Sequence, residues 1–403
     1  MPQICPYSDR CGGCRYIERS YEEQLALKQA QMTELFKGII TPEPIVGMTA
    51  SDCYGYRHKV QMAFSESRNG GNRASGNQRG DFRNGSKRGA GQRTVSCGNY
   101  EEESHTLVAT PDCLINHPQA NAVIEDVRKL CEKLKLPIYN EKTCRNGLRY
   151  VQVRVSHQTG DLMVILVTGE DVFPGQNNLV KELRKAHPEI KTIIHNTNGN
   201  RTSMVLTNRM KTIFGPGYIN DEMLGKTFRI SPGSFYQINP VQTEKLYNKA
   251  TELLNSSLTD RVLDAYCGTG TIGLIASDNA KEVIGVELNA AAVADAKLNA
   301  GKNGVTNARF VKADASDYLV EKEPPDLVIM DPPRSGSTEK FLTALATAGP
   351  KRIVYISCGP DTQKRDIQYL AGFGYRPEVL IPYDLFPFTS HVETVILMSK
   401  ILN

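Results

Sequence analysis

The sequence has no apolar run that approaches the length of a membrane span, and its first residues lack the charged and apolar regions of a secretory signal. With 40% hydrophobic and 23% charged residues, its composition is that of a soluble globular protein. Ten cysteines in 403 residues do not resemble a small disulfide scaffold, so we expect reduced thiols, metal ligands or nucleophiles. We therefore predict a cytoplasmic protein of two or three domains with no membrane partner.

The net charge of +4 is small but unevenly distributed. Residues 67–94 are mostly Gly, Asn, Arg and Ser, and Phe82 is their only large apolar side chain. Because such a segment cannot bury enough apolar surface to fold, we predict a disordered insertion between two strands. Its basic residues face Asp81 alone and account for the whole positive excess of the chain: Arg68, Arg73, Arg79, Arg83, Lys87, Arg88 and Arg93.

The first half of the chain alternates helices and strands without a cofactor loop. An amphipathic helix at 18–37 is ended by Pro42 and Pro44. We predict a mixed α+β N-terminal and central domain over residues 1–225 that binds the substrate, with the first helix free to pack on the second domain. Its further elements are strands at 54–64, 150–155, 162–167 and 192–195 and helices at 117–136 and about 176–187.

The second half has a regular alternation of apolar and helical segments. It predicts a doubly wound, mostly parallel Rossmann-like sheet in an α/β domain over residues 226–403. The five expected strands are residues 261–265, 283–287, 309–312, 326–330 and 352–357.

The loop after the first of these strands resembles a nucleotide-cofactor site. Gly268 and Gly270 let the backbone turn tightly and approach a ligand. Glu287 ends the next strand, where a carboxylate can bind ribose hydroxyls. With Gly273 the spacing also satisfies G-x-G-x-x-G, so the loop alone leaves a nicotinamide cofactor open.

The segment Asp331-Pro332-Pro333-Arg334 resembles the catalytic motif of S-adenosylmethionine methyltransferases, not of dehydrogenases. Methyltransferases acting on amino groups usually have an aromatic residue after the prolines, so Arg334 argues against an exocyclic amine as acceptor. Asp314, after the third strand, is a candidate for the adenine end of the cofactor or, equally, for a helix N-cap.

Cys358 follows the last apolar run, which places its thiol at the ligand edge of the sheet. A thiol there suits methylation of a poorly nucleophilic carbon such as a pyrimidine C5. Addition of the thiolate to C6 makes C5 reactive, and a base must later remove the C5 proton. Glu393, entering the final apolar strand, is the predicted base, and His391 is its competitor.

Five ordered motifs over about 160 residues resemble the RNA (uracil-5-)-methyltransferase family: residues 235–239, 264–270, 331–334, 357–360 and 391–394. That family modifies uridines of bacterial 23S ribosomal RNA or transfer RNA with S-adenosylmethionine. The resemblance implies that Cys358 is the nucleophile and Glu393 the base, and that an RNA-binding domain precedes the catalytic one. It favours 23S ribosomal RNA over transfer RNA. The residues it assigns to cofactor and reaction are Gln237, Tyr266, Glu287 and Asp331.

Three thiols lie close together near the N-terminus. Cys5, Cys11 and Cys14 flank two glycines and can converge on zinc or an iron–sulfur cluster. The resemblance implies a [4Fe–4S] cluster with Cys113 as last ligand and Cys97 as second choice, and unliganded thiols are the plainer alternative. The full set of candidates for the fourth ligand is Cys53, Cys97, Cys113, Cys131 and Cys144.

The sequence departs from the family in one respect. Many members acting on ribosomal RNA have a small β-barrel RNA-binding module before the cysteine segment, where this sequence begins. The Arg-rich insertion is either a substitute RNA contact or a solvated loop.

Three other functions stay open. A cytosine-5 RNA methyltransferase is disfavoured because no cysteine follows the prolines after Asp331, and the same prolines disfavour a dehydrogenase. A silent RNA-binding protein would not need Cys358 and Glu393. No obligate protein partner is expected.

Overall fold

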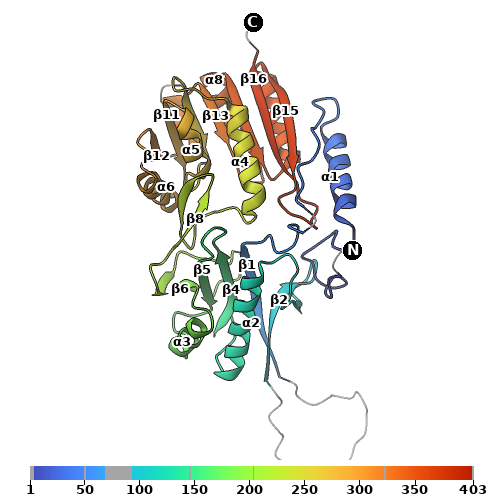
Figure 1. Cartoon of the computed structure of the whole chain (residues 1–403), viewed down its shortest axis with the longest axis vertical. Helices are drawn as coiled ribbons and strands as arrows, with labels where there is room; N and C mark the ends of the chain where they lie inside the picture. Colours follow the sequence, from blue (N-terminus) through green and yellow to red (C-terminus); the bar gives the residue numbers. More distant parts are fainter. Residues whose placement is uncertain are drawn as a thin grey trace, which may run out of the picture.

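The computed structural model describes residues 4–49, 51–68, 93–144, 147–202, 204–321 and 324–401. The predicted insertion at 67–94 therefore lies almost entirely outside the described residues. Two seven-stranded sheets form the two halves of the molecule in Figure 1, and a two-stranded hairpin lies between them along the chain. Within the described residues, no helix combines the length and the hydropathy that a bilayer crossing requires.

The first sheet has the order β3-β2-β1-β4-β5-β6-β7 and is antiparallel except where β5 pairs with β6. Apolar side chains of two helices, α2 and α3, share one core with its strands. The elements are β1 (Lys59–Arg68), β2 (Arg93–Tyr100), β3 (Leu107–Ala109), α2 (Pro118–Lys133), β4 (Leu148–Val155), β5 (Leu162–Thr168), α3 (Gln176–Ala186), β6 (Ile190–Thr197) and β7 (Met210–Phe214).

One strand begins later than its apolar pattern indicates. The expected strand at 54–64 starts only at Lys59, because Gly55 has a φ of +64° and turns the chain. The following Tyr56 donates a hydrogen bond from its hydroxyl to Pro387 O (3.1 Å), far along the sequence. This turn therefore belongs to a contact with the C-terminal part of the chain.

A hairpin of β8 (Ile219–Met223) and β9 (Lys226–Ile230) leads to the second sheet. The predicted boundary between residues 225 and 226 falls inside its turn, and the division into domains stays a prediction. The backbone N–H of Arg229 donates to Asn299 Oδ1 (2.7 Å) on α6, so β9 is joined to the second half of the molecule.

The second sheet has the order β12-β11-β10-β13-β14-β16-β15, in which β16 alone runs antiparallel to β14. One core packs α4, α5 and α6 on one face, and another packs α7, α8 and α9 on the other. The predicted Rossmann-like α/β fold is confirmed. The elements are α4 (Pro240–Leu254), β10 (Arg261–Ala265), α5 (Thr271–Ala276), η1 (Ser277–Asn279), β11 (Glu282–Glu287), α6 (Ala290–Lys302), β12 (Ala308–Lys312), α7 (Ala315–Glu321), β13 (Leu327–Met330), α8 (Glu339–Ala348), β14 (Arg352–Ser357), α9 (Pro360–Ala371), β15 (Tyr375–Tyr383) and β16 (Glu393–Lys400).

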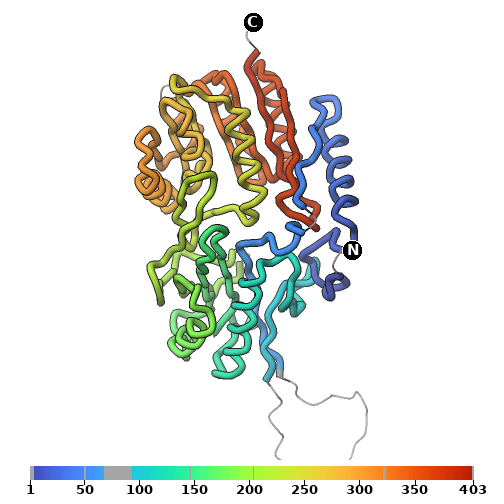
Figure 2. The backbone as a smooth tube through the Cα atoms, viewed as in Figure 1, coloured from blue at the N-terminus to red at the C-terminus, as the bar shows by residue number. Residues whose placement is uncertain are grey.

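The N-terminal helix α1 (Tyr21–Leu35) packs on this second sheet, not on the first. It begins with a capping box in which Ser20 and Glu23 exchange hydrogen bonds. Met32 and Phe36 are fully buried in the core that also contains α9. The chain after α1 runs beside β15, where Val46 forms a parallel bridge with Tyr383. Figure 2 shows this early segment next to the last strands.

We expect Met32→Ala to lower the free energy of unfolding by about 2–5 kcal/mol, because it leaves a cavity between α1 and the second sheet. Leu27→Ala on the same helix is the control, since Leu27 is 40% exposed. Its cost should stay near 0.5 kcal/mol, roughly, as for other surface changes. Urea unfolding measures both, and equal costs for the two variants would contradict the docking of α1.

Candidate active site

The loop after β10 is backbone-strained and partly open. Tyr266 has a φ of +63°, which is unusual for a bulky residue and indicates a conformation imposed by its surroundings. Gly268 has open space beside it, since an added Cβ would meet no atom within 4 Å. At Gly270 a Cβ would lie 2.7 Å from the Phe310 ring, so this glycine permits close packing of α5. Of the two predicted glycines, only Gly268 leaves room for a ligand.

Two carboxylates lie at neighbouring strand ends. Glu287 accepts hydrogen bonds from the backbone N–H of Gly268 (3.2 Å) and of Asn289 (2.7 Å), which places it against the loop after β10. Asp314 accepts from the Ser316 backbone N–H (2.8 Å) at the start of α7, and hydrogen bonds with the Ser316 side chain and, less strongly, this backbone group lower the pKa of Asp314. Asp314 therefore caps α7, and its contact with a cofactor stays a prediction.

Strand pairing brings Cys358 and Glu393 together from distant parts of the chain. Cys358 follows β14 directly, and Glu393 is the first residue of β16. These strands pair antiparallel with Ser357 opposite Thr394. Cys358, which follows Ser357, and Glu393, which precedes Thr394, therefore lie at the same sheet edge. Asp331 follows β13, the neighbour of β14 on its other side.

The three groups are electrostatically coupled. Burial raises the pKa of Asp331 to about 7. Burial, and then repulsion from Asp331, raises the pKa of Glu393 to about 8. Burial, followed by Glu393 and Asp331, raises the pKa of the Cys358 thiol to about 11, against a smaller lowering by Arg334. At neutral pH the protein without ligands therefore holds a neutral thiol beside carboxyl groups that are readily protonated.

Two polar side chains of α9 support this sheet edge, and sequence reasoning missed both. Gln363 accepts a hydrogen bond from Thr394 Oγ1 (2.6 Å) and donates to Tyr355 O (3.0 Å), which connects β16 with β14. Asp366 accepts from Tyr355 Oη (2.7 Å) and from the backbone N–H of Ser337 (2.8 Å). Their positions on a helix carry no local signal, because the partners lie on other strands and loops.

The start of α4 reaches the same region. Burial raises the pKa of Tyr247 well above its usual value, Asp331 raises it further, and a hydrogen bond with Gln237 opposes both. The predicted residue Gln237 thus lies within hydrogen-bond distance of Tyr247. Tyr247 itself was missed, since its spacing on α4 is that of an ordinary core residue.

The four predicted metal-ligating cysteines, Cys5, Cys11, Cys14 and Cys113, line one cavity of about 20 Å³. Burial raises the pKa of Cys14 to about 12, and the other three thiols contribute in the same direction. In the part of the chain that is described, no three His, Cys, Asp or Glu side chains are arranged to hold a metal ion.

None of the other four candidates for the fourth ligand lines this cavity. Cys97 and Cys131 belong to the core of the first sheet. Cys53 is buried next to the cysteine cavity without lining it, and Cys144 contacts Arg201. Of the five candidates, Cys113 is the one whose side chain lines the cavity.

Comparison with known proteins agrees with the fold. A family profile described as a methyltransferase domain matches residues 257–367. The tRNA (uracil-54, C5)-methyltransferase of Pyrococcus abyssi in complex with S-adenosyl-L-homocysteine superposes with a TM-score of 0.76 at 24% identity, over 98% of this chain and 88% of that one. The fold is thus that of the S-adenosylmethionine-dependent methyltransferases.

Two relatives are similar over nearly the whole chain. An uncharacterized RNA methyltransferase of Oceanobacillus iheyensis is 38% identical over 96% of this chain and 80% of its own length. One of Staphylococcus aureus is 38% identical over 98% of this chain and 83% of its own length. The chain belongs to this RNA methyltransferase family, which confirms the membership that its motifs predicted.

We expect the stability of the protein to fall between pH 5 and pH 8 because of Glu393. Its pKa rises from 4.5 to about 8 on folding, so the stability it contributes is full below about pH 4.5 and is lost as the pH rises toward 8. The free energy of unfolding of Glu393→Gln, relative to that of the natural protein, should therefore be about 1–3 kcal/mol higher at pH 8 than at pH 5.

Denaturant unfolding at the two pH values measures this difference. Glu34→Gln is the matched control, since Glu34 is 78% exposed. A pH dependence unchanged by Glu393→Gln would show that the Glu393 carboxyl is ionised in the folded protein.

Proposed function

We propose that this protein transfers a methyl group from S-adenosylmethionine to C5 of a uridine in RNA through a covalent bond between Cys358 and C6. The observation that carries the proposal is the pairing of β14 with β16, which sets a thiol and a buried carboxyl group at one sheet edge beside the loop after β10. RNA as the substrate class is supported by the relatives, which are RNA methyltransferases.

The proposed cofactor site lies at the ends of β10, β11 and β13. The open space at Gly268 admits the methionine part of the cofactor, and Glu287, at the end of β11, is placed to accept the ribose hydroxyls. Gln237 and Asp331 are the proposed cofactor and reaction residues on the other side of this site; a hydrogen bond of Gln237 with Tyr247, and the electrostatic effect of Asp331 on the same Tyr247, support their grouping. Tyr266, Gly270 and Asp314 complete the proposed set.

The reaction balances with this chain's two groups. The Cys358 thiolate forms a bond to C6, and the C5–C6 π electrons move toward C5 and O4. C5 then attacks the methyl carbon, and the S–CH₃ bond breaks with its electrons remaining on sulfur. Glu393 removes the proton from C5, the C5–C6 double bond re-forms, and the bond to Cys358 breaks.

The raised pKa values demand that bound ligands change the charge balance. A sulfonium next to Cys358 and Glu393 favours both ionised forms, because an opposite charge within about 4–6 Å lowers the pKa of an acid. Helix α9 begins at Pro360, two residues after Cys358. The partial positive charge at its N-terminus also favours the thiolate form of Cys358. Thiolate and base therefore form chiefly in the ternary complex.

Two RNA classes are candidates for the substrate. We favour 23S ribosomal RNA, because that target is common in the RNA (uracil-5-)-methyltransferase family, which the motifs of this chain resemble. Transfer RNA is the second candidate, because the Pyrococcus abyssi enzyme of similar fold is a tRNA (uracil-54, C5)-methyltransferase. A cytoplasmic location follows from either substrate.

The test uses RNA transcripts that contain 5-fluorouridine, together with S-adenosylmethionine. Fluorine cannot leave C5 as a cation, so the enzyme should stop after methyl transfer with Cys358 still bound to C6. We expect a protein–RNA adduct that survives a denaturing gel, and its absence in Cys358→Ala. The RNA class that forms the adduct identifies the substrate.

The matched control is Cys144→Ser, a cysteine that contacts Arg201 and lies outside the proposed site. This variant should form the adduct as the natural protein does. Absence of an adduct with both ribosomal and transfer RNA would reject the uridine reaction, and an adduct retained in Cys358→Ala would reject the nucleophile.

We further propose that the four cavity cysteines hold a [4Fe–4S] cluster. Four soft thiols around one cavity support it, and zinc is the alternative that the same thiols suit. Arg57 also lines the cavity, and a buried cation there suits four thiolates. When bound, such a cluster would stabilise the N-terminal segment.

Protein purified without oxygen should contain about four irons per chain together with sulfide and show broad visible absorbance. Cys113→Ser should lose most of the iron and unfold at a lower temperature, whereas Cys131→Ser, in the core of the first sheet, should keep the iron. Iron analysis and thermal unfolding measure this. One zinc per chain would favour zinc, and a metal-free stable protein would reject both.

A further inference from the structure

The loop between β15 and β16, residues 384–392, ends at the proposed base. Donors from other segments reach five consecutive backbone carbonyls of this β15–β16 loop. Gln242 Nε2 donates to Asp384 O (3.2 Å), and Asn239 Nδ2 to Leu385 O (2.9 Å), both from the start of α4. These hydrogen bonds satisfy the carbonyls and tie the loop to the segments around it.

The other three carbonyls are bound by the N-terminal part of the chain. Lys28 Nζ donates to Phe386 O (3.1 Å), and Tyr56 Oη to Pro387 O (3.1 Å). The backbone N–H groups of residues 15 and 16, next to the cysteine segment, both donate to Phe388 O (2.9 Å).

Phe388 lies in a strained conformation at the centre of this arrangement. Its φ is +67°, which a bulky residue adopts only where its surroundings impose it. Its backbone N–H donates to Gln24 Oε1 (2.6 Å) on α1, and its ring stacks on Tyr54 at 4.9 Å between centroids. The N-terminal segment therefore contacts the loop at Phe388, shortly before Glu393.

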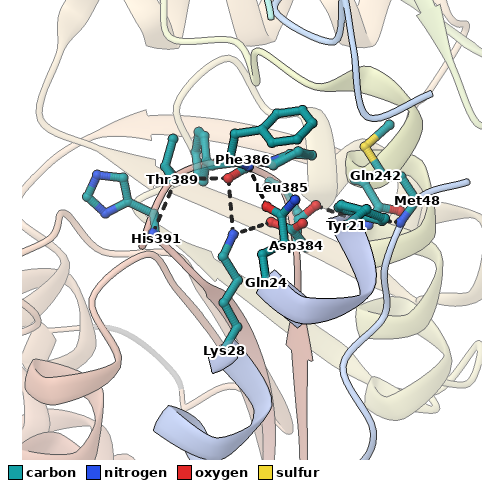
Figure 3. A network of polar contacts seen from close by, with 12 residues as sticks. Tyr21, Gln24, Lys28, Met48, Gln242, Asp384, Leu385, Phe386, Thr389 and His391 are labelled. Atoms are coloured by element: carbon teal, nitrogen blue, oxygen red, sulfur yellow. Dashed lines mark hydrogen bonds and ion pairs between the residues drawn. The ribbon is translucent and has the colours of Figure 1, made fainter. Parts of the chain in front are cut away.

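The strongest single contact is an ion pair. Lys28 Nζ lies 2.6 Å from Asp384 Oδ1, and both side chains are fully buried. Figure 3 shows Lys28 extending from α1 between Asp384 and Phe386, at the first and third residues of the loop. A buried ion pair contributes little stability compared with an apolar pair of similar size, but it requires a defined geometry. Its presence therefore indicates that the position of the β15–β16 loop relative to α1 matters for function.

We propose that Lys28 is a positioning residue that acts through Asp384 and Phe386 to place the Glu393 carboxylate for removal of the C5 proton. This inference rests on the proposed uridine-C5 reaction. Lys28 lies on a helix remote in sequence from every residue of that reaction, and it touches neither thiol nor base. Without it the thiol can still add to C6 and C5 can still take the methyl group, since Cys358 directly follows β14, but resolution of the adduct slows.

The test follows methylated adduct on ordinary uridine RNA in a single turnover. Lys28→Met, and Lys28→Met combined with Asp384→Leu, should both accumulate protein–RNA adduct with adduct breakdown at least about tenfold slower than in the natural protein. The double variant replaces the ion pair by apolar groups of similar size, so its unfolding midpoint should stay near that of the natural protein. Lys37→Met, an exposed lysine just after α1, is the control and should resolve the adduct normally.

Several outcomes would overturn the inference. A folded double variant that turns over without adduct, or that loses methyl transfer and turnover in parallel, would show that the pair does not position the base. An unfolded double variant would assign the pair to stability. If the natural protein forms no adduct even with 5-fluorouridine RNA, the proposed reaction is wrong and this inference falls with it, which separates the two failures.

Discussion

The antiparallel pairing of β16 between β14 and β15 is the constraint on which the site depends. It sets the first residue of β16 beside the residue that follows β14, so Glu393 and Cys358 meet across one hydrogen-bonded strand pair. A parallel last strand would carry Glu393 to the opposite edge of the sheet. The same pairing places the β15–β16 loop at this edge, where five of its carbonyls accept hydrogen bonds from other segments.

Burial then determines the chemistry available at that edge. Burial raises the pKa of two carboxyl groups and a thiol; Asp331 further raises the pKa of Glu393, and both carboxyl groups raise that of Cys358. Without ligands the region holds neutral groups and costs stability as the pH rises. In the proposed reaction, a cationic cofactor beside these groups would favour their ionised forms, because a nearby opposite charge lowers the pKa of an acid.

The described residues from Arg15 to Val46 belong structurally to the half that contains the second sheet. Met32 and Phe36 complete the core on one face of the second sheet, and Val46 extends the sheet edge beside β15. The cysteine cavity lies directly before this segment, and the backbone N–H groups of Arg15 and Tyr16 reach the β15–β16 loop. The cysteine segment is therefore connected by two backbone hydrogen bonds to the loop before Glu393.

Local patterns were enough to predict the strands of the second sheet and the residues at their ends. Apolar runs separated by helices place Glu287, Asp331 and Cys358 at one edge whatever the rest of the chain does, because parallel strands share a direction. Local patterns did not predict β15, because Pro377 and Pro382 interrupt its strand pattern. The two prolines are tolerated because β15 lies at the edge of the sheet.

The sequence by itself determined the fold class, the order of the motifs and which residue types stand at the strand ends. Only the tertiary structure decided that Glu393 lies beside Cys358, that Cys113 rather than another cysteine joins the first three, and that Lys28 meets Asp384 from 356 residues away. These contacts depend on strand register and on the docking of α1, and neither leaves a periodic trace in the residues concerned.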